Sequence, residues 1–408
     1  ERRPAPSRLT EFYLCVSVGG VVGGATTALL APVIFDSVAE YPLMLVLAAL
    51  ARPAVRRTHD RADKVVAGIA ALALAGMLAL TIADAASQIF VMVLLLLGWA
   101  AATLLRAHRL LFAITLAALA AQVALASQGG SLHSTRTFFG VHRVSETVAP
   151  QLGGTVRLLS HGTTIHGSQA QAAAFRCAPS AYYARQGAIG QTYVGMAADR
   201  PSLRIGVVGL GAGATAAYLR ASDSLRYFEI DPEVERIARD PRLFSYLNGC
   251  AKGPVDVVLG DARLTLAKEP AGSYDLLHLD AFSSDAIPTH LLTVQAIEQY
   301  LRALKPDGVL LMHLTNRHLA LEAPAAAAAE RLGASALFQS YRPPEDVHRM
   351  VAAPTRVVLI AKSPEALERF ADDPRWREAR AGGTRPWTDD YTNVVGSLID
   401  GLSSEDVR

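Results

Sequence analysis

The 408-residue sequence contains few charged residues and few cysteines. Charged residues make up 19% of the chain and hydrophobic residues 51%, with a mean hydropathy of +0.25. These values exclude a disordered chain or a collagen, and they are high for one wholly soluble domain. The net charge of +2, without a run of Lys and Arg interleaved with aromatic residues, gives no indication of nucleic-acid binding.

Three cysteines are too few for a disulfide framework or a zinc cluster, and no pair has the CxxC spacing of a metal or redox site. We therefore expect no metal. Cys15, Cys177 and Cys250 are expected to be buried thiols. A bridge between Cys177 and Cys250 would form only in an oxidising compartment.

Charge is distributed unevenly along the chain. Residues 1–130 contain 10 Lys and Arg and 7 Asp and Glu, whereas the remaining residues contain 29 and 30. The charge-poor part predicts an all-α transmembrane region, and the rest is typical of a globular domain. Short β-type runs predict a small β unit and a connection over 131–200, followed by a Rossmann-like nucleoside-binding catalytic domain over 201–408. Because the chain begins with Glu1, we expect it to be a portion of a longer polypeptide.

Five apolar runs lie in the first part, at 11–36, 41–51, 65–83, 89–105 and 110–127. At about 1.5 Å per residue, four of them can cross a bilayer core of about 30 Å, while the second is short. We therefore expect a multi-pass protein of the cell (inner) membrane, with the lipid bilayer as a partner. Small residues on one helix face (Gly19-Gly20 and Gly23-Gly24) predict close packing with another helix, either in a homo-oligomer or in a longer chain.

The loops between these runs predict an orientation. Five positive charges crowd residues 52–64, Arg106 and Arg109 lie in another loop, and the loop at 84–88 has none. The positive-inside rule places the first two loops in the cytoplasm. The globular part would then lie outside, which conflicts with the cytoplasmic location expected for the ligand inferred below.

From residue 201, apolar strands alternate with helices, which predicts a parallel sheet covered on both faces. The motif GLGAG at 209–213 follows the first strand and precedes a helix predicted to start over 213–220. Glycines there permit tight turns and close approach of a ligand to a helix N-terminus. Glu229 ends the next strand, where a carboxylate can accept hydrogen bonds from ribose hydroxyls. Together these features predict a nucleoside-binding site.

Acidic residues also follow the third and fourth strands. Asp261, before Ala262, either binds an adenine amino group or caps the next helix. Asp280 and Asp285 lie at the carboxyl edge of the sheet, where they could accept a proton from an amine or hold a cationic substrate. The alternative is a turn that caps a helix. Asp389-Asp390, in the segment WTDDY, either closes over the pocket or forms a solvated loop.

In this order the motifs GLGAG, FEID, GDA and YDLLHLDAFSSD resemble those of the polyamine (spermidine) synthases. These are aminopropyltransferases with a methyltransferase-like Rossmann fold behind a small N-terminal β unit. The segments DAFSSDAIP and WTDDYTN are more specific than the Gly-rich turn. The chain looks like the membrane-fused branch of spermidine synthase-like proteins, in which a transporter-like helical part precedes the synthase domain.

The resemblance implies a role for each matching residue. The donor would be decarboxylated S-adenosylmethionine or S-adenosylmethionine, and the acceptor a small amine. The implied donor-binding residues are Gly209, Gly211 and Gly213 for the methionine-derived part, Glu229 for the ribose, and Asp261 with Ala262 for the adenine. The implied residues of the amine side are Asp280 as catalytic base, Asp285 as the second catalytic and polyamine-binding carboxylate, and Gln169, Tyr183, Asp389 and Asp390 around the substrate. His166 lies near the same pocket, although a lone histidine is more often structural.

Two departures from the family pattern fall where the aminopropyl group and its acceptor should meet. Ala212 stands where the family has an Asp that binds the donor's amino group, and Ala281-Phe282 interrupts the Asp-Ser-Ser-Asp motif. The leading hypothesis is an SN2-type transfer from a sulfonium nucleoside to an amine. The alternatives are methyl transfer from S-adenosylmethionine, or a non-catalytic module that only binds a nucleoside or polyamine. A nicotinamide dehydrogenase would need a substrate domain that the sequence lacks.

Overall fold

A computed structural model describes residues 4–52, 65, 68–69, 88–128, 131–162, 164–281 and 288–403. The chain forms two compact units, Glu1–Val141 and His142–Arg408. Each unit is described by itself below.

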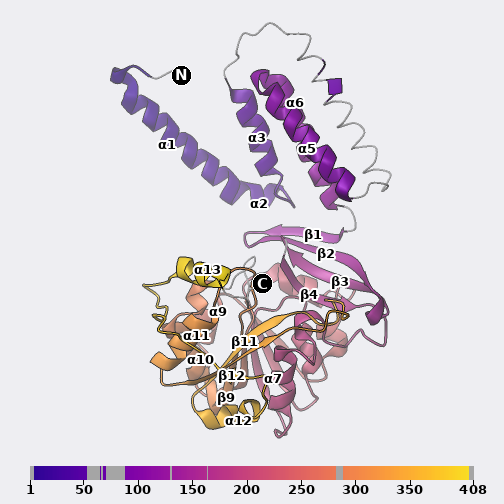
Figure 1. Ribbon diagram of the computed structural model, residues 1–408, viewed down its shortest axis with the longest axis vertical. Coiled ribbons are helices and arrows are strands. Elements are labelled where there is room, and N and C mark those ends of the chain that lie inside the picture. Colours follow the sequence, from indigo (N-terminus) through magenta and orange to yellow (C-terminus); the bar gives the residue numbers. More distant parts are fainter. Residues whose placement is uncertain are drawn as a thin grey trace. The chain divides into compact units, whose positions relative to one another are not determined.

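The first unit is built mainly from apolar helices (Figure 1). Its elements are α1 (Leu9–Ala25), α2 (Ala31–Ile34), α3 (Glu40–Ala51), α5 (Gln88–Leu104), α6 (Arg109–Gln128) and β1 (Ser131–Thr137). A π-helical turn, Thr26–Leu30, joins α1 to α2, so that Pro6–Ile34 is one helix of 29 residues. Among the described residues this is the one helix long and apolar enough to cross a membrane. The predicted run at 65–83 lies almost wholly outside the described residues.

Small residues have different surroundings in the two parts of this unit. A Cβ atom on Gly98 would lie 2.6 Å from Leu119 Cδ2, so the glycine lets α5 and α6 approach closely. By contrast, the described residues place no atom within 4 Å of a Cβ added at Gly19, Gly20, Gly23 or Gly24. The helix packing predicted for these four glycines therefore remains a prediction.

The second unit begins with a small antiparallel sheet of β2 (Gly140–Ala149), β3 (Gly154–His161) and β4 (Thr164–Ala170). Val144 and Leu159 of this sheet pack against Ala212 and Ile237 of the following domain. The buried imidazole Nε2 of His142 lies 2.8 Å from Asp231 Oδ2, just beyond the second strand of that domain. The small sheet therefore covers the carboxyl edge of the central sheet.

The central sheet has eight strands in the order β12-β10-β11-β9-β8-β5-β6-β7. Their bounds are β5 (Arg204–Val208), β6 (Ser224–Glu229), β7 (Val255–Leu259), β8 (Tyr274–Leu279), β9 (Leu304–His313), β10 (Ser335–Tyr341), β11 (Thr355–Ala361) and β12 (Arg377–Glu378). Strands β5 to β9 are mutually parallel, and β11 runs antiparallel to both β9 and β10. This is the methyltransferase-like Rossmann arrangement, and the predicted fold class is confirmed.

The predicted parallel sheet includes antiparallel pairing at one end, where β11 lies between β9 and β10. No crossover helix separates β10 from β11, and a chain that returns without a crossover pairs its strands antiparallel. The helix predicted over 213–220 is wrong in type, because residues Ala214–Tyr218 form a short 3-10 turn. Gly213 before it is left-handed and Leu219 after it is extended, which leaves no room for an α-helix.

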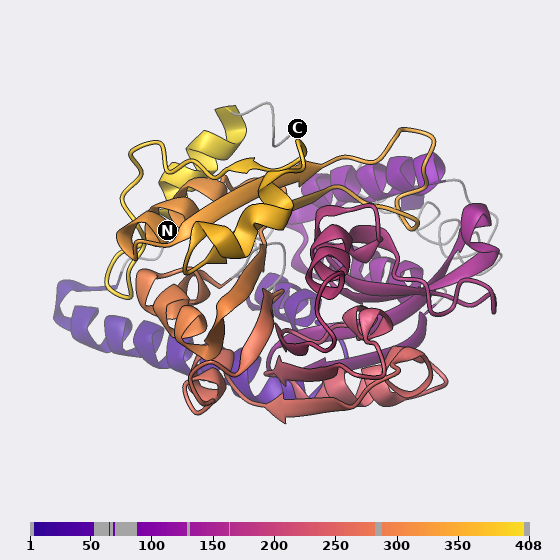
Figure 2. The same ribbon diagram turned by 90° about the horizontal axis from the view of Figure 1, so that it is seen from below.

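Helices cover both faces of the central sheet (Figures 1 and 2). The helices of this unit are α7 (Ala188–Ala197), α8 (Pro232–Arg239), α9 (Ala262–Leu266), α10 (Val294–Ala303), α11 (Glu322–Arg331) and α12 (Glu368–Ala371), and α13 (Val394–Ser403) is the last described helix. Along β8, Leu277 packs in the cluster containing Tyr300 of α10, and Leu276 packs in the cluster containing Tyr193 of α7. Alternate side chains of one strand thus face opposite cores, as the pleat requires.

Candidate functional site

The carboxyl ends of the parallel strands bring the predicted polar residues to one edge of the sheet. The Gly-rich turn follows β5, Glu229 ends β6, Asp261 follows β7 and Asp280 follows β8. In open α/β sheets this edge is where ligands bind. The positions of these residues at strand ends therefore place the candidate site at the carboxyl edge of the sheet.

Glu229 is buried and its carboxylate holds the Gly-rich turn. Its Oε2 accepts a hydrogen bond from the Leu210 N–H at 2.8 Å, and its Oε1 accepts one from the Asp231 N–H at 2.9 Å. Burial raises the pKa of this carboxyl above its ordinary value, and the two backbone hydrogen bonds oppose that shift only in part. The contact with a ribose stays a prediction, and the contacts found are with the turn's own backbone.

The glycines of the turn allow protein segments to approach closely. Gly209 and Gly211 both have positive φ, and a Cβ atom on either would overlap the backbone carbonyl of Asp280 or of His166. A Cβ atom on Gly167 would likewise overlap the Cβ of Ala212, which is 1% exposed. Ala212 therefore lies under β4, and a longer acidic side chain there would meet the backbone of that strand.

Two side chains, one on each carboxylate oxygen, contact Asp280. The Tyr183 hydroxyl donates a hydrogen bond to its Oδ2, and the His313 Nδ1 lies 2.7 Å from its Oδ1. Burial is the largest single influence and pushes the pKa of the Asp280 carboxyl upward, but His313, His278 and Tyr183 together outweigh it and leave the pKa below its ordinary value. Burial raises the pKa of Tyr183 well above its ordinary value. At neutral pH the site therefore holds a buried carboxylate and a protonated phenol.

His313 is a site residue that the sequence analysis missed. It ends β9, is buried, and its Nε2 lies 2.8 Å from Thr315 Oγ1. Thr315 Oγ1 also accepts a hydrogen bond from the Arg356 N–H, and its second lone pair can accept one from a protonated His313 Nε2. The ring of Tyr182 lies 5.3 Å from that of His313. The signal was present in the sequence, because His313 ends the strand beside β8 at the same edge as Asp280.

Several other predicted residues have structural contacts. Asp261 accepts a hydrogen bond from the Leu264 N–H at 3.2 Å and caps α9, whose first residue is Ala262. Gln169 is fully engaged: its amide donates to the Arg176 carbonyl and to Ser245 Oγ, each at 3.0 Å, and its carbonyl accepts from the Ser245 N–H. These contacts do not test the proposed ligand roles, but they account for the residue types.

The acidic segment Asp389-Asp390 contacts residues of α9 and of the start of α10. Asp389 makes two contacts with the Arg263 guanidinium, at 2.8 and 2.9 Å, and accepts a hydrogen bond from Thr293. The Arg263 hydrogen bond is the main cause that lowers the pKa of Asp389. Asp390 is exposed.

Two residues of the segment after β8, Phe282 and Asp285, lie outside the described residues. Within the described ranges, no group of three or more His, Cys, Asp or Glu could hold a metal.

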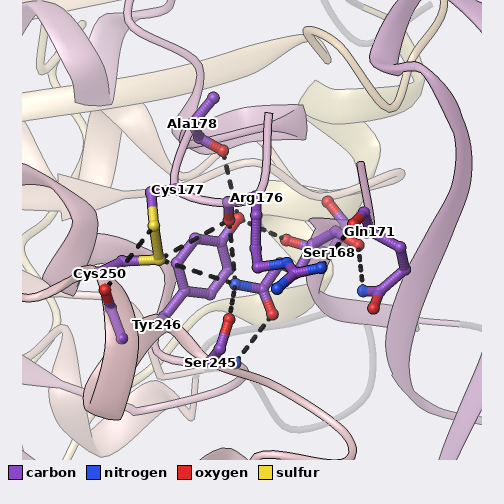
Figure 3. Close-up of a disulfide and its surroundings, with 10 residues drawn as sticks. Ser168, Gln171, Arg176, Cys177, Ala178, Ser245, Tyr246 and Cys250 are labelled. Carbon is purple, nitrogen blue, oxygen red and sulfur yellow. Dashed lines mark hydrogen bonds between the residues drawn. A yellow bond between two sulfur atoms is a disulfide. The ribbon is translucent and has the colours of Figure 1, made fainter. Parts of the chain in front are cut away.

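The cysteines differ from the prediction of three buried thiols. Cys15 is exposed, and Cys177 is bonded to Cys250 across 73 residues of sequence (Figure 3). The Tyr246 hydroxyl donates to the carbonyl of Ser168 at 2.9 Å beside the bridge. The tertiary fold brings the segment after β4 against the segment Tyr246–Cys250, with a Cα–Cα distance of 5.2 Å, and this proximity could not be read from the spacing.

His166 lies in a row of three histidines on the small sheet. The ring centroids of His142 and His161 are 5.5 Å apart, and those of His161 and His166 are 5.9 Å apart. Burial is the main cause that lowers the pKa of His161 below its ordinary value, and the neighbouring His142 adds to it. The backbone of His166 lies against Gly211, so this row borders the Gly-rich turn.

Comparison with known proteins identifies one curated relative. A polyamine aminopropyltransferase from Vibrio vulnificus is 31% identical over 124 residues, which are 29% of this chain. This part of the chain is similar to the polyamine aminopropyltransferases. The predicted resemblance to the spermidine synthases is thereby confirmed, whereas the membrane-fused branch stays a prediction; the chain spans only 40% of that relative's length. No protein-family model matches the chain.

Solved structures of spermidine synthases also resemble the chain. A probable spermidine synthase from Corynebacterium glutamicum is 16% identical, with a TM-score of 0.45 over 65% of this chain and 97% of that one. The enzyme from Thermotoga maritima is 14% identical, with a TM-score of 0.37 over 66% and 84%. A spermidine synthase in complex with the transition-state analogue AdoDATO is 13% identical, with a TM-score of 0.39 over 66% and 85%.

Proposed function

We propose that this protein is a membrane-anchored transferase that moves an aminopropyl or related group from a sulfonium nucleoside to an amine. The observation that carries the proposal is Asp280: a buried, ionised carboxylate at the carboxyl edge of the sheet, next to the Gly-rich turn and held by Tyr183 and His313. The similarity to a polyamine aminopropyltransferase supports the same chemistry.

In the proposed reaction the group passes directly from donor to acceptor, without a covalent bond to the protein. The amine nitrogen attacks the carbon next to the sulfonium, the C–N bond forms, and the C–S bond breaks with its electrons remaining on sulfur. The neutral thioether leaves, and the amine gives up a proton. Asp280 would orient the attacking amine and accept that proton, while the site aligns donor and acceptor. A carboxylate with a low pKa also attracts a cationic amine.

Ala212 supports a second candidate. With Ala212 buried under β4, the turn presents no carboxylate for the ammonium of an aminopropyl group. Methyl transfer from S-adenosylmethionine does not require that carboxylate. The donor's identity therefore decides between two reactions that share the same nucleoside site.

The decisive experiment supplies the purified full chain with labelled donor and a panel of amines and identifies the nucleoside product. Methylthioadenosine indicates aminopropyl transfer from the decarboxylated donor, and S-adenosylhomocysteine indicates methyl transfer. Asp280→Asn is the matched variant, because it keeps the shape of the side chain and removes the charge. Donor binding by calorimetry with no turnover in the unaltered protein would leave only the non-catalytic binding module.

We further propose a multi-pass arrangement with the α/β unit on the outer side of the membrane, which requires the sulfonium nucleoside to reach that side. The loop charges at 52–64 and 106–109 and the Cys177–Cys250 disulfide both support that side, since disulfides persist in oxidising compartments. A membrane-impermeant thiol reagent applied to intact cells, after reduction with an impermeant phosphine, would label Cys177 or Cys250 if the unit is outside. Labelling that requires cell lysis would place the unit in the cytoplasm.

A further inference from the structure

In α13, the last described helix, small residues are buried and aliphatic residues are exposed, which is the reverse of the usual pattern. Its buried residues are small, Ser397 and Gly401, and its exposed residues are aliphatic. The exposed side chains are Val394, Val395, Leu398, Ile399 and Leu402. Ile399 and Leu402 are 60% and 62% exposed. A helix on the surface of a soluble domain normally turns its aliphatic side inward. The exposed aliphatic face of α13 is therefore expected to contact another apolar surface.

The orientation of α13 is set by close contacts on its small-residue side. A Cβ atom on Gly401 would overlap the carbonyl oxygen of His318, and the Ala320 N–H donates a hydrogen bond to the Ser397 carbonyl at 2.9 Å. These contacts leave no room to rotate the helix and bury its aliphatic side. At about 100° per residue, Asp400 lies on the opposite side of the helix from Leu398 and Leu402, so the aliphatic face carries no charge of its own.

The position of α13 in the α/β unit is known from its contacts. His318 and Ala320 belong to the segment that follows β9, so α13 lies at the carboxyl edge of the central sheet and at the periphery of the unit (Figures 1 and 2). The small sheet covers the same edge, where His142 of β2 bonds to Asp231. The chain therefore enters the α/β unit through this small sheet, at the edge that carries α13.

We propose that the aliphatic face of α13 lies in the interfacial region of the bilayer that anchors this chain. The inference rests on the membrane anchoring proposed above. The apolar first unit is joined through the chain to this edge, and α13 offers there an uncharged aliphatic face of the kind that interfacial helices bury. The candidate active-site edge would then face the membrane, and the acceptor amine would reach it along the membrane surface.

The test uses the full chain in phosphatidylcholine vesicles, with and without brominated acyl chains that quench fluorescence on contact. A Cys15→Ala background receives one fluorescent label, at Ile399→Cys or at a control position, Ala221→Cys, which is exposed just before β6 at the opposite edge. We expect brominated lipid to quench the label at 399 by about twofold or more and to leave the label at 221 unchanged. Equal emission with both lipids at 399 overturns the proposal.

Two controls separate the possible failures. Flotation of the vesicles in alkaline carbonate reports the anchoring itself, so a chain that does not float overturns both proposals. A chain that floats but whose label at 399 is unquenched overturns only the role of α13. Disulfide cross-linking between two Ile399→Cys chains would show that a second copy covers the face and would equally overturn the lipid assignment. Leu402→Asp, at the same face, should reduce quenching at 399, whereas Asp400→Asn should not.

Discussion

Replacement of His313 tests the physical basis of the candidate site most directly. His313 is the main group that opposes the effect of burial on Asp280. In His313→Gln the side-chain amide can still donate a hydrogen bond to Asp280 but cannot carry charge, whereas His313→Ala removes the partner altogether. Burial of Asp280 is unchanged in both, so its pKa should rise in both and rise further in the alanine variant.

The magnitude follows from the 2.7 Å contact between His313 Nδ1 and Asp280 Oδ1. A hydrogen bond to a charged group contributes about 1.5–3 kcal/mol, which corresponds to about one to two pKa units. In the unaltered protein the pKa of Asp280 is already below its ordinary value, so the carboxylate form persists from mildly acidic to neutral pH. In the variants the carboxylate should be lost as the pH falls through the raised pKa.

The assay is kcat/KM for transfer from labelled donor, measured across mildly acidic to neutral pH. We expect an acid limb that is absent from the unaltered protein to appear in His313→Gln, and to lie at higher pH in His313→Ala. The control is His290→Gln, because His290 is half exposed and lies 3.8 Å from Asp261, away from the pair. If activity falls uniformly at every pH in the His313 variants, His313 does not act through the charge of Asp280 and the reasoning is refuted.

Three further predictions concern stability and the donor. Loss of the Cys177–Cys250 bridge in the double Ser variant should lower the free energy of unfolding by about 4 kcal/mol, because the bridge closes a loop of 73 residues. Urea denaturation measures this loss, and a value under about 1 kcal/mol would contradict the prediction. Ala212→Asp should lower the melting temperature and not tighten binding of decarboxylated S-adenosylmethionine, because the carboxylate would be buried against β4; tighter binding at unchanged stability would contradict this packing. Glu229→Gln should cost about 1–3 kcal/mol, because an amide can accept only one of the two backbone hydrogen bonds. The raised pKa of Glu229 makes its contribution to stability decrease as pH rises from its unfolded pKa through its folded one, so the variant should remove that decrease between mildly acidic and neutral urea titrations.

Much of the candidate site could be predicted because its residues are placed by local structure. An apolar strand followed by a turn puts the next residues at the carboxyl edge, whatever the rest of the fold does. The Gly-rich turn, Glu229 and Asp280 were found in this way. His313 follows the same rule and could have been found, whereas the pairing of Gln169 with Ser245 depends on segments 76 residues apart.

The sequence by itself determined the division into an apolar helical part and an α/β part, the order of the strands along the chain, and the strand ends that carry acidic groups. These features depend on hydropathy, spacing and turn residues, which act over a few residues. The tertiary structure alone decided that Asp280 meets Tyr183 and His313, that Cys177 bonds to Cys250, and that β4 closes over Ala212. Each of these contacts joins segments that lie apart in the chain. The contact of Asp280 with His313 follows from the pairing of β8 with β9, and the approach of β4 to Ala212 follows from how the small sheet packs on the central sheet.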